Sequence, residues 1–222
     1  SRNFFIDKGI IYVSPNGNDE YTGTRTHPFK TLSRAVAYSA ASYRKTIYLT
    51  KGTYELHNTL DIENSVTIIG GYEQGDWSGN SSGMTVLQPG RYFKAGSPLM
   101  RTKGAEVVFK NISFRDTSEK VSEYISAAGS ELTIENCLIT LTGITAYGIR
   151  QNSGTLSIKN TELVSNTKNS VSVIEMQKGS LSITNSRIIN KSNPDIIMLV
   201  TLYDVPRADI SDTIILPGKG TE

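Results

Sequence analysis

The stretch LTIENCLI at residues 132–139 is one of four similar copies in this chain. The other three begin at Val107, Leu156 and Leu181, and each copy carries an asparagine at the same place. These are Asn111, Asn136, Asn160 and Asn185, which stand 25, 24 and 25 residues apart. Four copies at so constant a period predict a repeat architecture in which each copy belongs to one structural unit.

Apolar and polar residues alternate before each asparagine, which is the period of a β-strand. The residues expected on the inner face are Val107, Phe109, Leu132, Ile134, Leu156, Ile158, Leu181 and Ile183. A second apolar strand is predicted before each copy, at residues 98–101, 124–126, 147–149 and 171–175, and again at 196–202. Gly104, Gly129, Gly154 and Gly179 separate the two strands, as expected where a chain turns at positive φ. Two or three short strands in about 25 residues, with no helix between them, predict a parallel β-solenoid.

The four asparagines have a structural interpretation in such a fold. At one corner of successive coils their amides can donate to and accept from each other, forming a ladder. Charged residues are expected to stack in the same way, with Lys110 beside Glu135, Glu162 beside Arg187, and Arg150 beside Glu175. Neither pattern requires a ligand.

Composition narrows the functional classes. The 222 residues carry a formal net charge of +2, which gives no broad field for nucleic acid or an anionic membrane. The sequence contains no run of about 18 apolar residues that could span a membrane. Its one cysteine, Cys137, excludes an internal disulfide and a cysteine-rich zinc module.

The chain is expected to form one domain over residues 1–222, divided into three parts. Residues 1–65 form a cap and the first coil, 66–110 a coil with a long insertion, and 111–216 regular coils of about 25 residues. Within the cap, a helix is predicted over residues 33–42, with Leu32, Val36, Ala37 and Ala40 at helical spacing. A short amphipathic helix here would close the N-terminal end of the solenoid.

The head of the chain resembles a known group of proteins. It contains YVS at 12–14, GND at 17–19, PFKTL at 28–32, IYL at 47–49 and GTY at 52–54. This string is similar to the opening of pectin-lyase-like proteins, close to a domain of unknown function that heads secreted bacterial members. The stretch VTIIGGY at 66–72, followed by Trp77, resembles a segment of exported bacterial lipoproteins.

The resemblance implies an all-β fold, a right-handed single-stranded parallel β-helix of about six coils with an N-terminal α-helical cap. The handedness comes from the resemblance alone. The resemblance also implies an exported protein that is secreted, periplasmic or held at the cell surface as a lipoprotein.

Activity is not implied, because the superfamily holds lyases, hydrolases and non-catalytic proteins. The strings typical of its galacturonan hydrolases, Asn-Thr-Asp and Gly-His-Gly, do not occur, and no residue is assigned a catalytic role. The first hypothesis is therefore a non-catalytic binding or scaffolding module. The alternative is a lyase or glycoside hydrolase acting on an acidic polysaccharide. A third hypothesis is assembly, with the C-terminal coil covered by further chain or by a partner, because residues 217–222 provide no evident cap.

Six residues form the candidate binding surface, for a carbohydrate or a surface protein: Tyr72, Trp77, Tyr92, Arg101, Arg115 and Arg150. For Trp77, packing of the insertion onto the cap is the competing interpretation. No cofactor is expected. Asn16, Asn18 and Asp19 are a weak calcium candidate, because oxygen ligands fall at short spacing, although such residues also form turns.

Overall fold

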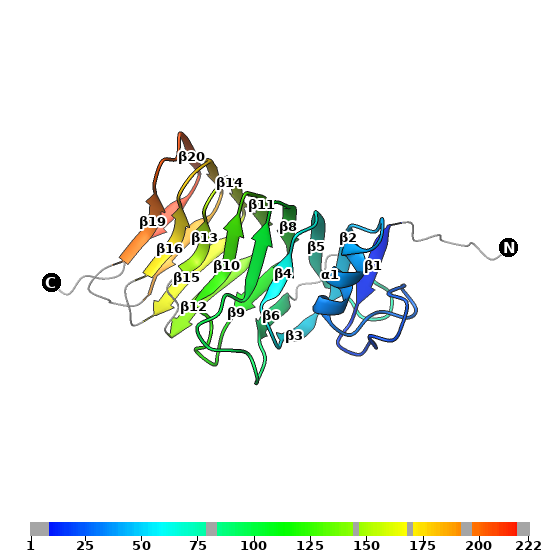
Figure 1. Ribbon diagram of the computed structural model, residues 1–222. Helices are drawn as coiled ribbons and strands as arrows, with labels where there is room; N and C mark the ends of the chain where they lie inside the picture. Colours follow the sequence, from blue (N-terminus) through cyan, green and yellow to red (C-terminus); the bar gives the residue numbers. More distant parts are fainter. Residues whose placement is uncertain (1–8, 79–83, 144–146, 168–170, 192–196, 217–222) are drawn as a thin grey trace.

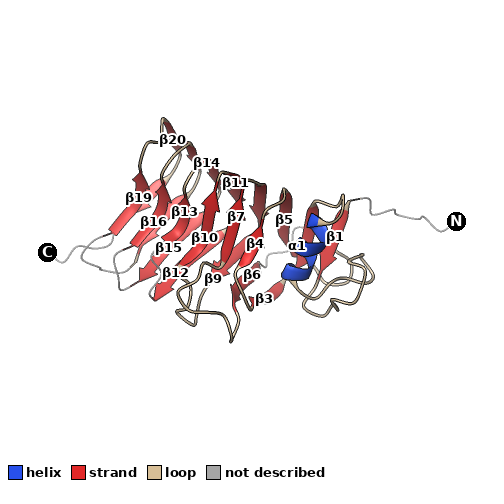
Figure 2. Cartoon of the chain, in the orientation of Figure 1, coloured by secondary structure: helices blue, strands red, loops and turns tan. Residues whose placement is uncertain are grey.

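The computed structural model describes residues 9–78, 84–143, 147–167, 171–191 and 197–216. Over these residues the chain is a rod of three parallel sheets wound around one apolar core (Figure 1). Figure 2 shows the strands following one another along the rod, with the one helix of the described residues at its N-terminal end. The predicted parallel β-helix with an N-terminal cap is confirmed.

Three strands, one from each sheet, form each coil. Sheet A contains β1 (Ile10–Val13), β2 (Thr46–Thr50), β5 (Val66–Tyr72), β8 (Glu106–Lys110), β11 (Ser130–Glu135), β14 (Gly154–Lys159), β17 (Ser180–Thr184) and β20 (Arg207–Ser211). Sheet B contains β3 (Gly52–Leu56), β6 (Thr85–Pro89), β9 (Ile112–Arg115), β12 (Leu138–Gly143), β15 (Glu162–Thr167), β18 (Arg187–Asn190) and β21 (Ile214–Leu216). Sheet C contains β4 (Leu60–Ile62), β7 (Met100–Lys103), β10 (Glu123–Ala128), β13 (Tyr147–Gln151), β16 (Val171–Met176) and β19 (Ile197–Leu202). The described residues thus form six complete coils, from β2–β4 to β17–β19.

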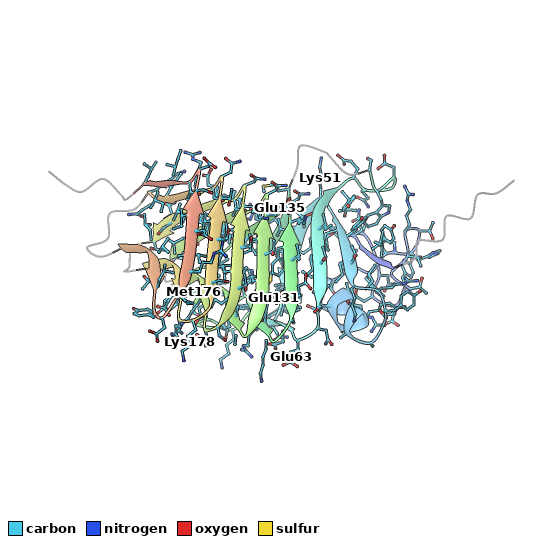
Figure 3. All side chains as sticks on the ribbon, turned by 90° about the horizontal axis from the view of Figure 1, so that it is seen from above. Lys51, Glu63, Glu131, Glu135, Met176 and Lys178 are labelled. Carbon is cyan, nitrogen blue, oxygen red and sulfur yellow. The ribbon has the colours of Figure 1, made fainter. Side chains whose placement is uncertain are left out.

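The inner face of sheet A follows the predicted alternation. Phe109, Ile134, Ile158 and Ile183 stand in register on four successive strands, and all four are fully buried. The outer positions of the same strands are polar except for Val108, and Figure 3, which looks onto sheet A, shows Glu131 and Glu135 at opposite ends of β11. Since strands that alternate in this way bury one face only, the repeat itself generates the core.

The corners of the coils require backbone conformations with positive φ. The four repeat asparagines lie between sheets A and B with φ between 47° and 57°, in the left-handed region that asparagine tolerates better than most residues. Gly104 and Gly154 lie at the corner between sheets C and A, with φ of 61° and 101°. Asparagine and glycine therefore recur because the chain turns there.

The helix α1 (Leu32–Ala40) closes the N-terminal end. The hydroxyl of Thr31 accepts a hydrogen bond from the backbone N–H of Arg34, which caps the first turn. Its buried face consists of Leu32, Ala35, Val36 and Ser39, whereas Ala37 and Ala40 are exposed. The helix lies where the sequence predicts it, but its apolar face is formed partly by residues other than the predicted ones.

The long insertion does not interrupt the coil that contains it. Strands β5, β6 and β7 occupy the same positions in sheets A, B and C as their counterparts in other coils. The extra residues divide between two connections, 73–84 before β6 and 90–99 after it. Of its five glycines, Gly79 and Gly83 lie outside the described residues, as do Ile196 and residues 217–222.

The predicted charge pairs between coils are confirmed. Lys110 lies 2.7 Å from Glu135, and Arg187 lies 3.2 Å from Glu162. The third predicted pair, Arg150 with Glu175, is less exposed and belongs to a larger group of side chains on sheet C.

Candidate functional site

The outer face of sheet C carries a row of charged residues along the rod. Strand pairing places Arg101 beside Asp61 and Ser126, and Arg150 beside Ser126 and Glu175. Each step along this row is one coil, about 4.8 Å. Arg101 and Arg150, both predicted as binding residues, are therefore two coils apart on one face.

Arg150 lies at the centre of a compact group, which we call the Arg150 cluster: Glu123, Tyr147, Arg150 and Glu175. Its Nε donates to Glu175 Oε1 at 3.0 Å, and its Nη1 lies 3.6 Å from Glu123 Oε1. The guanidinium also lies over the ring of Tyr147, 4.9 Å from the centroid. One cation thus links two carboxylates from different coils and an aromatic ring.

The carboxylates of Glu123 and Glu175 are more buried than is usual on the outer face of a sheet. The side chain of Glu123 is 16% exposed and that of Glu175 is 10% exposed, against 36% for Arg150. Oε2 of Glu123 is buried and makes no hydrogen bond within the described part of the chain. Gln177 Nε2 makes a second, longer contact with Glu175 Oε1 at 3.4 Å. A buried acceptor without a donor costs free energy.

The charge state of Arg150 follows from its neighbours. Burial disfavours the charged guanidinium, but the hydrogen bond to Glu175 and the negative charges of Glu175 and Glu123 outweigh it and raise the pKa of Arg150. Arg150 therefore stays protonated and cannot accept a proton from a substrate. The formal charge of the Arg150 cluster, two glutamates against one arginine, is −1.

Two neighbouring connections lead from sheet B into sheet C. Residues 90–99 precede β7 and residues 116–122 precede β10, and Gly96 N–H donates to the carbonyl of Lys120 between them. The carboxylate of Asp116 accepts backbone N–H groups of Ser118, Lys120 and Val121 and so fixes the second connection. Tyr92 projects from the first connection with 79% of its surface exposed.

The other predicted surface residues lie elsewhere. Arg115 is on sheet B, where its Nε donates to Gln88 Oε1 at 3.2 Å. Tyr72 stacks on Tyr48, with ring centroids 4.1 Å apart, on the outer side of sheet A. The six residues therefore do not form one continuous surface.

Trp77 joins the insertion to the cap. Its ring packs edge-on against Tyr12 at 4.7 Å, and its Nε1 donates to the carbonyl of Arg25 at 3.1 Å. The residue is 8% exposed and has a φ of 55°, a conformation that costs a non-glycine residue about 1–2 kcal/mol. These contacts correspond to the packing interpretation of Trp77.

Replacing Trp77 with alanine is expected to lower the free energy of unfolding by about 2 kcal/mol, because a buried aromatic side chain loses its contacts. Thermal melting by circular dichroism would measure this. The matched control is Tyr92→Ala, which should change stability by less than about 0.5 kcal/mol since Tyr92 is exposed. Equal effects of the two substitutions would contradict the packing role.

The repeat asparagines are exposed or half-buried along the corner between sheets A and B. Asn185 Nδ2 donates to Asn160 Oδ1 at 2.8 Å, which is one step of an amide ladder. Asn111 Nδ2 instead points to the carbonyl of Gly70, at 3.5 Å. Their shared feature is the left-handed backbone, to which the ladder contact is added.

The calcium candidate lies in the loop before α1. Both carboxylate oxygens of Asp19 are engaged, Oδ1 by the N–H groups of Lys30 and Thr31 and Oδ2 by the hydroxyl of Thr31. Asn18 Oδ1 accepts from the N–H of Glu20, a local turn bond. Here Asp19 holds the loop to the start of the helix, and calcium binding stays a prediction.

Sequence reasoning finds part of the Arg150 cluster. Arg150 and Glu175 are 25 residues apart, so the repeat period aligns them. The repeat period does not align Glu123 with Arg150. Glu123 pairs with Tyr147, three residues before Arg150 on β13, and reaches the guanidinium diagonally. Only the strand register reveals that contact.

Among the described residues no helix has the length and apolar character needed to cross a membrane.

Comparison with protein families matches residues 15–199 to the family described as "Protein of unknown function (DUF1565)". The uncharacterized protein YwoF of Bacillus subtilis (strain 168) is 46% identical over 57 residues, which are 26% of this chain and 11% of YwoF. The chain therefore matches only a small part of that relative.

Two solved structures are similar to most of the chain. The pectin methylesterase from Aspergillus niger shares 13% identity with a TM-score of 0.49, covering 97% of this chain and 87% of that one. A rhamnogalacturonan lyase shares 11% identity with a TM-score of 0.44, covering 96% and 63%. Likenesses of this size assign no activity.

Proposed function

Because this chain belongs to the DUF1565 family of proteins of unknown function, we propose its role from the geometry of its own side chains: a non-catalytic module, in an exported bacterial protein, that binds a neutral polysaccharide on the outer face of sheet C. The observation that carries the proposal is the Arg150 cluster. It places the ring of Tyr147 and the partly exposed guanidinium of Arg150 together on an outward face, and such groups contact the rings and hydroxyls of sugars.

The charge of the row favours a neutral ligand. Arg101 lies 3.2 Å from Asp61, and Arg150 is shared between Glu123 and Glu175. Both guanidiniums are thus paired with carboxylates of their own neighbours, and the formal charge of the Arg150 cluster, two glutamates against one arginine, is −1. An acidic polysaccharide would meet repulsion there, which weighs against the substrate class of the enzymatic alternative.

The protonation of Arg150 favours binding over lyase chemistry. A lyase requires a side chain that accepts a proton from the sugar, and a guanidinium held between two carboxylates does not do so. The one observation in favour of hydrolysis is that Glu123 and Glu175 lie on either side of Arg150. Two carboxylates are the usual requirement of a glycosidase, so the experiment must include a test for cleavage.

The proposal is tested by isothermal titration of the protein with neutral oligosaccharides (glucan, galactan, mannan and chitin series) and with polygalacturonate and alginate. At least one neutral series is expected to bind, and the anionic polymers to bind more weakly or not at all. Arg150→Gln should weaken that binding by about tenfold or more, since hydrogen bonds to a charged group contribute about 1.5–3 kcal/mol. Tyr147→Leu should weaken it while keeping the ion pairs.

The matched control is Arg187→Gln, which breaks the pair of Arg187 and Glu162 on sheet B at 3.2 Å. It should leave binding unchanged, and thermal melts would show that each variant is folded. Preference for the anionic polymers, or equal loss of binding in Arg150→Gln and Arg187→Gln, would refute the site. New reducing ends, or the ultraviolet absorbance of unsaturated sugars, would establish an enzyme instead.

A further inference from the structure

The cap covers the core of the rod but does not complete its first coil. Sheet A begins with β1, whereas sheet B begins one coil later with β3, its strand nearest to the cap (Figure 1). After β1 the chain passes Pro15, which lies so close to β3 that a methyl group at Gly52 would be 3.0 Å from its ring. Among the described strands β3 pairs only with β6, so its other edge is free.

This free edge faces a cleft of about 330 Å³. Pro15 and residues 30–32, at the start of α1, form one wall of the cleft, and residues 53–55 with His57 form the other. The second wall belongs to β3 and the first to the cap, on the side away from β6. The cleft therefore lies where a sheet B strand of the preceding coil would run.

The register of β3 shows which backbone groups face the cleft. The N–H of Gly90 donates to the carbonyl of Leu56, so Leu56 and Tyr54 direct their backbone groups to β6 in the parallel ladder. Thr53 and Glu55 alternate with them and direct theirs to the cleft, where no described residue bonds to these groups. An extended peptide presents N–H and C=O groups at the spacing that such an edge requires.

Two charged side chains make the cleft selective. Lys30 and Glu55 are exposed and line it from opposite walls, and no ion pair of the described residues involves either of them. The carboxylate of Glu55 has one long contact, 3.5 Å from Nε2 of Gln88 on β6. A basic residue placed opposite Glu55 would form a favourable cross-strand pair, and an acidic residue would complement Lys30. The cleft thus favours a strand that carries both charges on its outer face.

We propose that the edge of β3 is a docking site for an extended peptide of another protein, which adds to sheet B as the strand that the cap omits. The peptide places a basic side chain opposite Glu55 and an acidic one at Lys30. The site is distinct from the Arg150 cluster, which lies on sheet C, so it adds a protein partner to the sugar binding proposed above.

Nuclear magnetic resonance of the ¹⁵N-labelled protein tests both the edge and the ligand. In the free protein the amide hydrogens of Thr53 and Glu55 should exchange quickly, and those of Tyr54 and Leu56 slowly, since only the latter pair with β6. The probe is a capped hexapeptide, Thr-Val-Lys-Val-Glu-Thr, whose lysine and glutamate share one face of a strand. Its addition should slow the exchange of Thr53 and Glu55 and move their resonances.

Backbone methylation of the probe tests strand pairing directly. One peptide is N-methylated at its two valines and a second at its lysine and glutamate. Because alternate residues of a strand face the same neighbour, one of the two peptides should bind about tenfold or more weakly and the other should bind like the parent. Equal effects of the two modifications would overturn the proposal.

Variants of β3 test the same site from the protein side. Thr53→Pro removes an N–H from the free edge and no bond to β6, so the sheet should persist while peptide binding weakens by about tenfold or more. Thr53→Val keeps the N–H and should bind like the parent, and thermal melts would show that both variants are folded. Glu55→Lys should reverse the preference, toward a peptide with glutamate in place of lysine.

Three other results would overturn the proposal. Slow exchange of Thr53 and Glu55 in the free protein would mean that another part of this chain, or a second copy of it, already pairs with the edge. Unchanged resonances of both residues on addition of the probe would remove the ligand. Binding that is indifferent to Thr53→Pro would place the peptide elsewhere on the protein.

Discussion

Gly154→Ala is expected to lower the free energy of unfolding by at least about 3 kcal/mol. Gly154 begins β14 with a φ of 101°, outside the range that a side chain tolerates. A methyl group there would lie 2.1 Å from the carbonyl oxygen of Ser130 on the preceding coil, far inside van der Waals contact. Because the obstacle is backbone in a paired strand, it cannot turn aside as a side chain could, and the two coils must separate.

Gly104 is the matched control, since it occupies the same corner between sheets C and A. Its φ is 61°, and a methyl group there would meet nothing within 4 Å. Gly104→Ala should therefore cost only about 1–2 kcal/mol, the penalty of the left-handed conformation. Gly104→Asn should cost less, because asparagine tolerates this region.

The measurement is urea unfolding together with hydrogen exchange of individual peptides, since a solenoid unfolds by neighbouring coils and not always in one step. Gly154→Ala should lose protection first in β11 and β14, the strands on either side of the clash. Equal loss of stability in Gly154→Ala and Gly104→Ala would show that backbone conformation alone, without the contact to Ser130, sets the requirement for glycine.

These two glycines also show which features of the fold can be predicted from the sequence. The sequence predicts positive φ at each, as observed, but Gly104 stands seven residues before Asn111 and Gly154 six residues before Asn160. This offset of one residue places Gly154 opposite Ser130 in the strand pairing, whereas Gly104 precedes the paired residues of β8. The sequence therefore locates the corner, while the strand register shows which of its glycines lies against the backbone of the next coil.

The strands are predictable because alternation with period two is a strong signal in Val, Ile, Leu and Phe. The buried face of α1 is harder to predict, because small residues differ little in hydrophobicity. Ala35 and Ser39 are buried, whereas Ala37 and Ala40 are exposed. The Arg150 cluster is harder again. The contact between Glu123 and Arg150 runs diagonally between two adjacent strands, so the repeat period of the sequence does not predict it.

Phe109→Ala is expected to lower the free energy of unfolding by about 3–5 kcal/mol, more than Trp77→Ala, because Phe109 lies in the middle of the core. Phe109 is fully buried on β8 and packs edge-to-face with Phe114 on β9, with ring centroids 5.5 Å apart. Its neighbours in register are Ile68 and Ile134, so its removal leaves a cavity that touches three successive coils.

The cavity lies in the middle of the rod, where coils on both sides depend on it. Phe109→Leu is the matched variant, because it keeps an apolar side chain and should cost roughly half as much or less. Urea unfolding would measure both, and hydrogen exchange should show lost protection in β5, β8 and β11 together. If protection fell only in β8, the coils would be stabilised separately, and the core would not be the continuous column that the aligned residues of sheet A form.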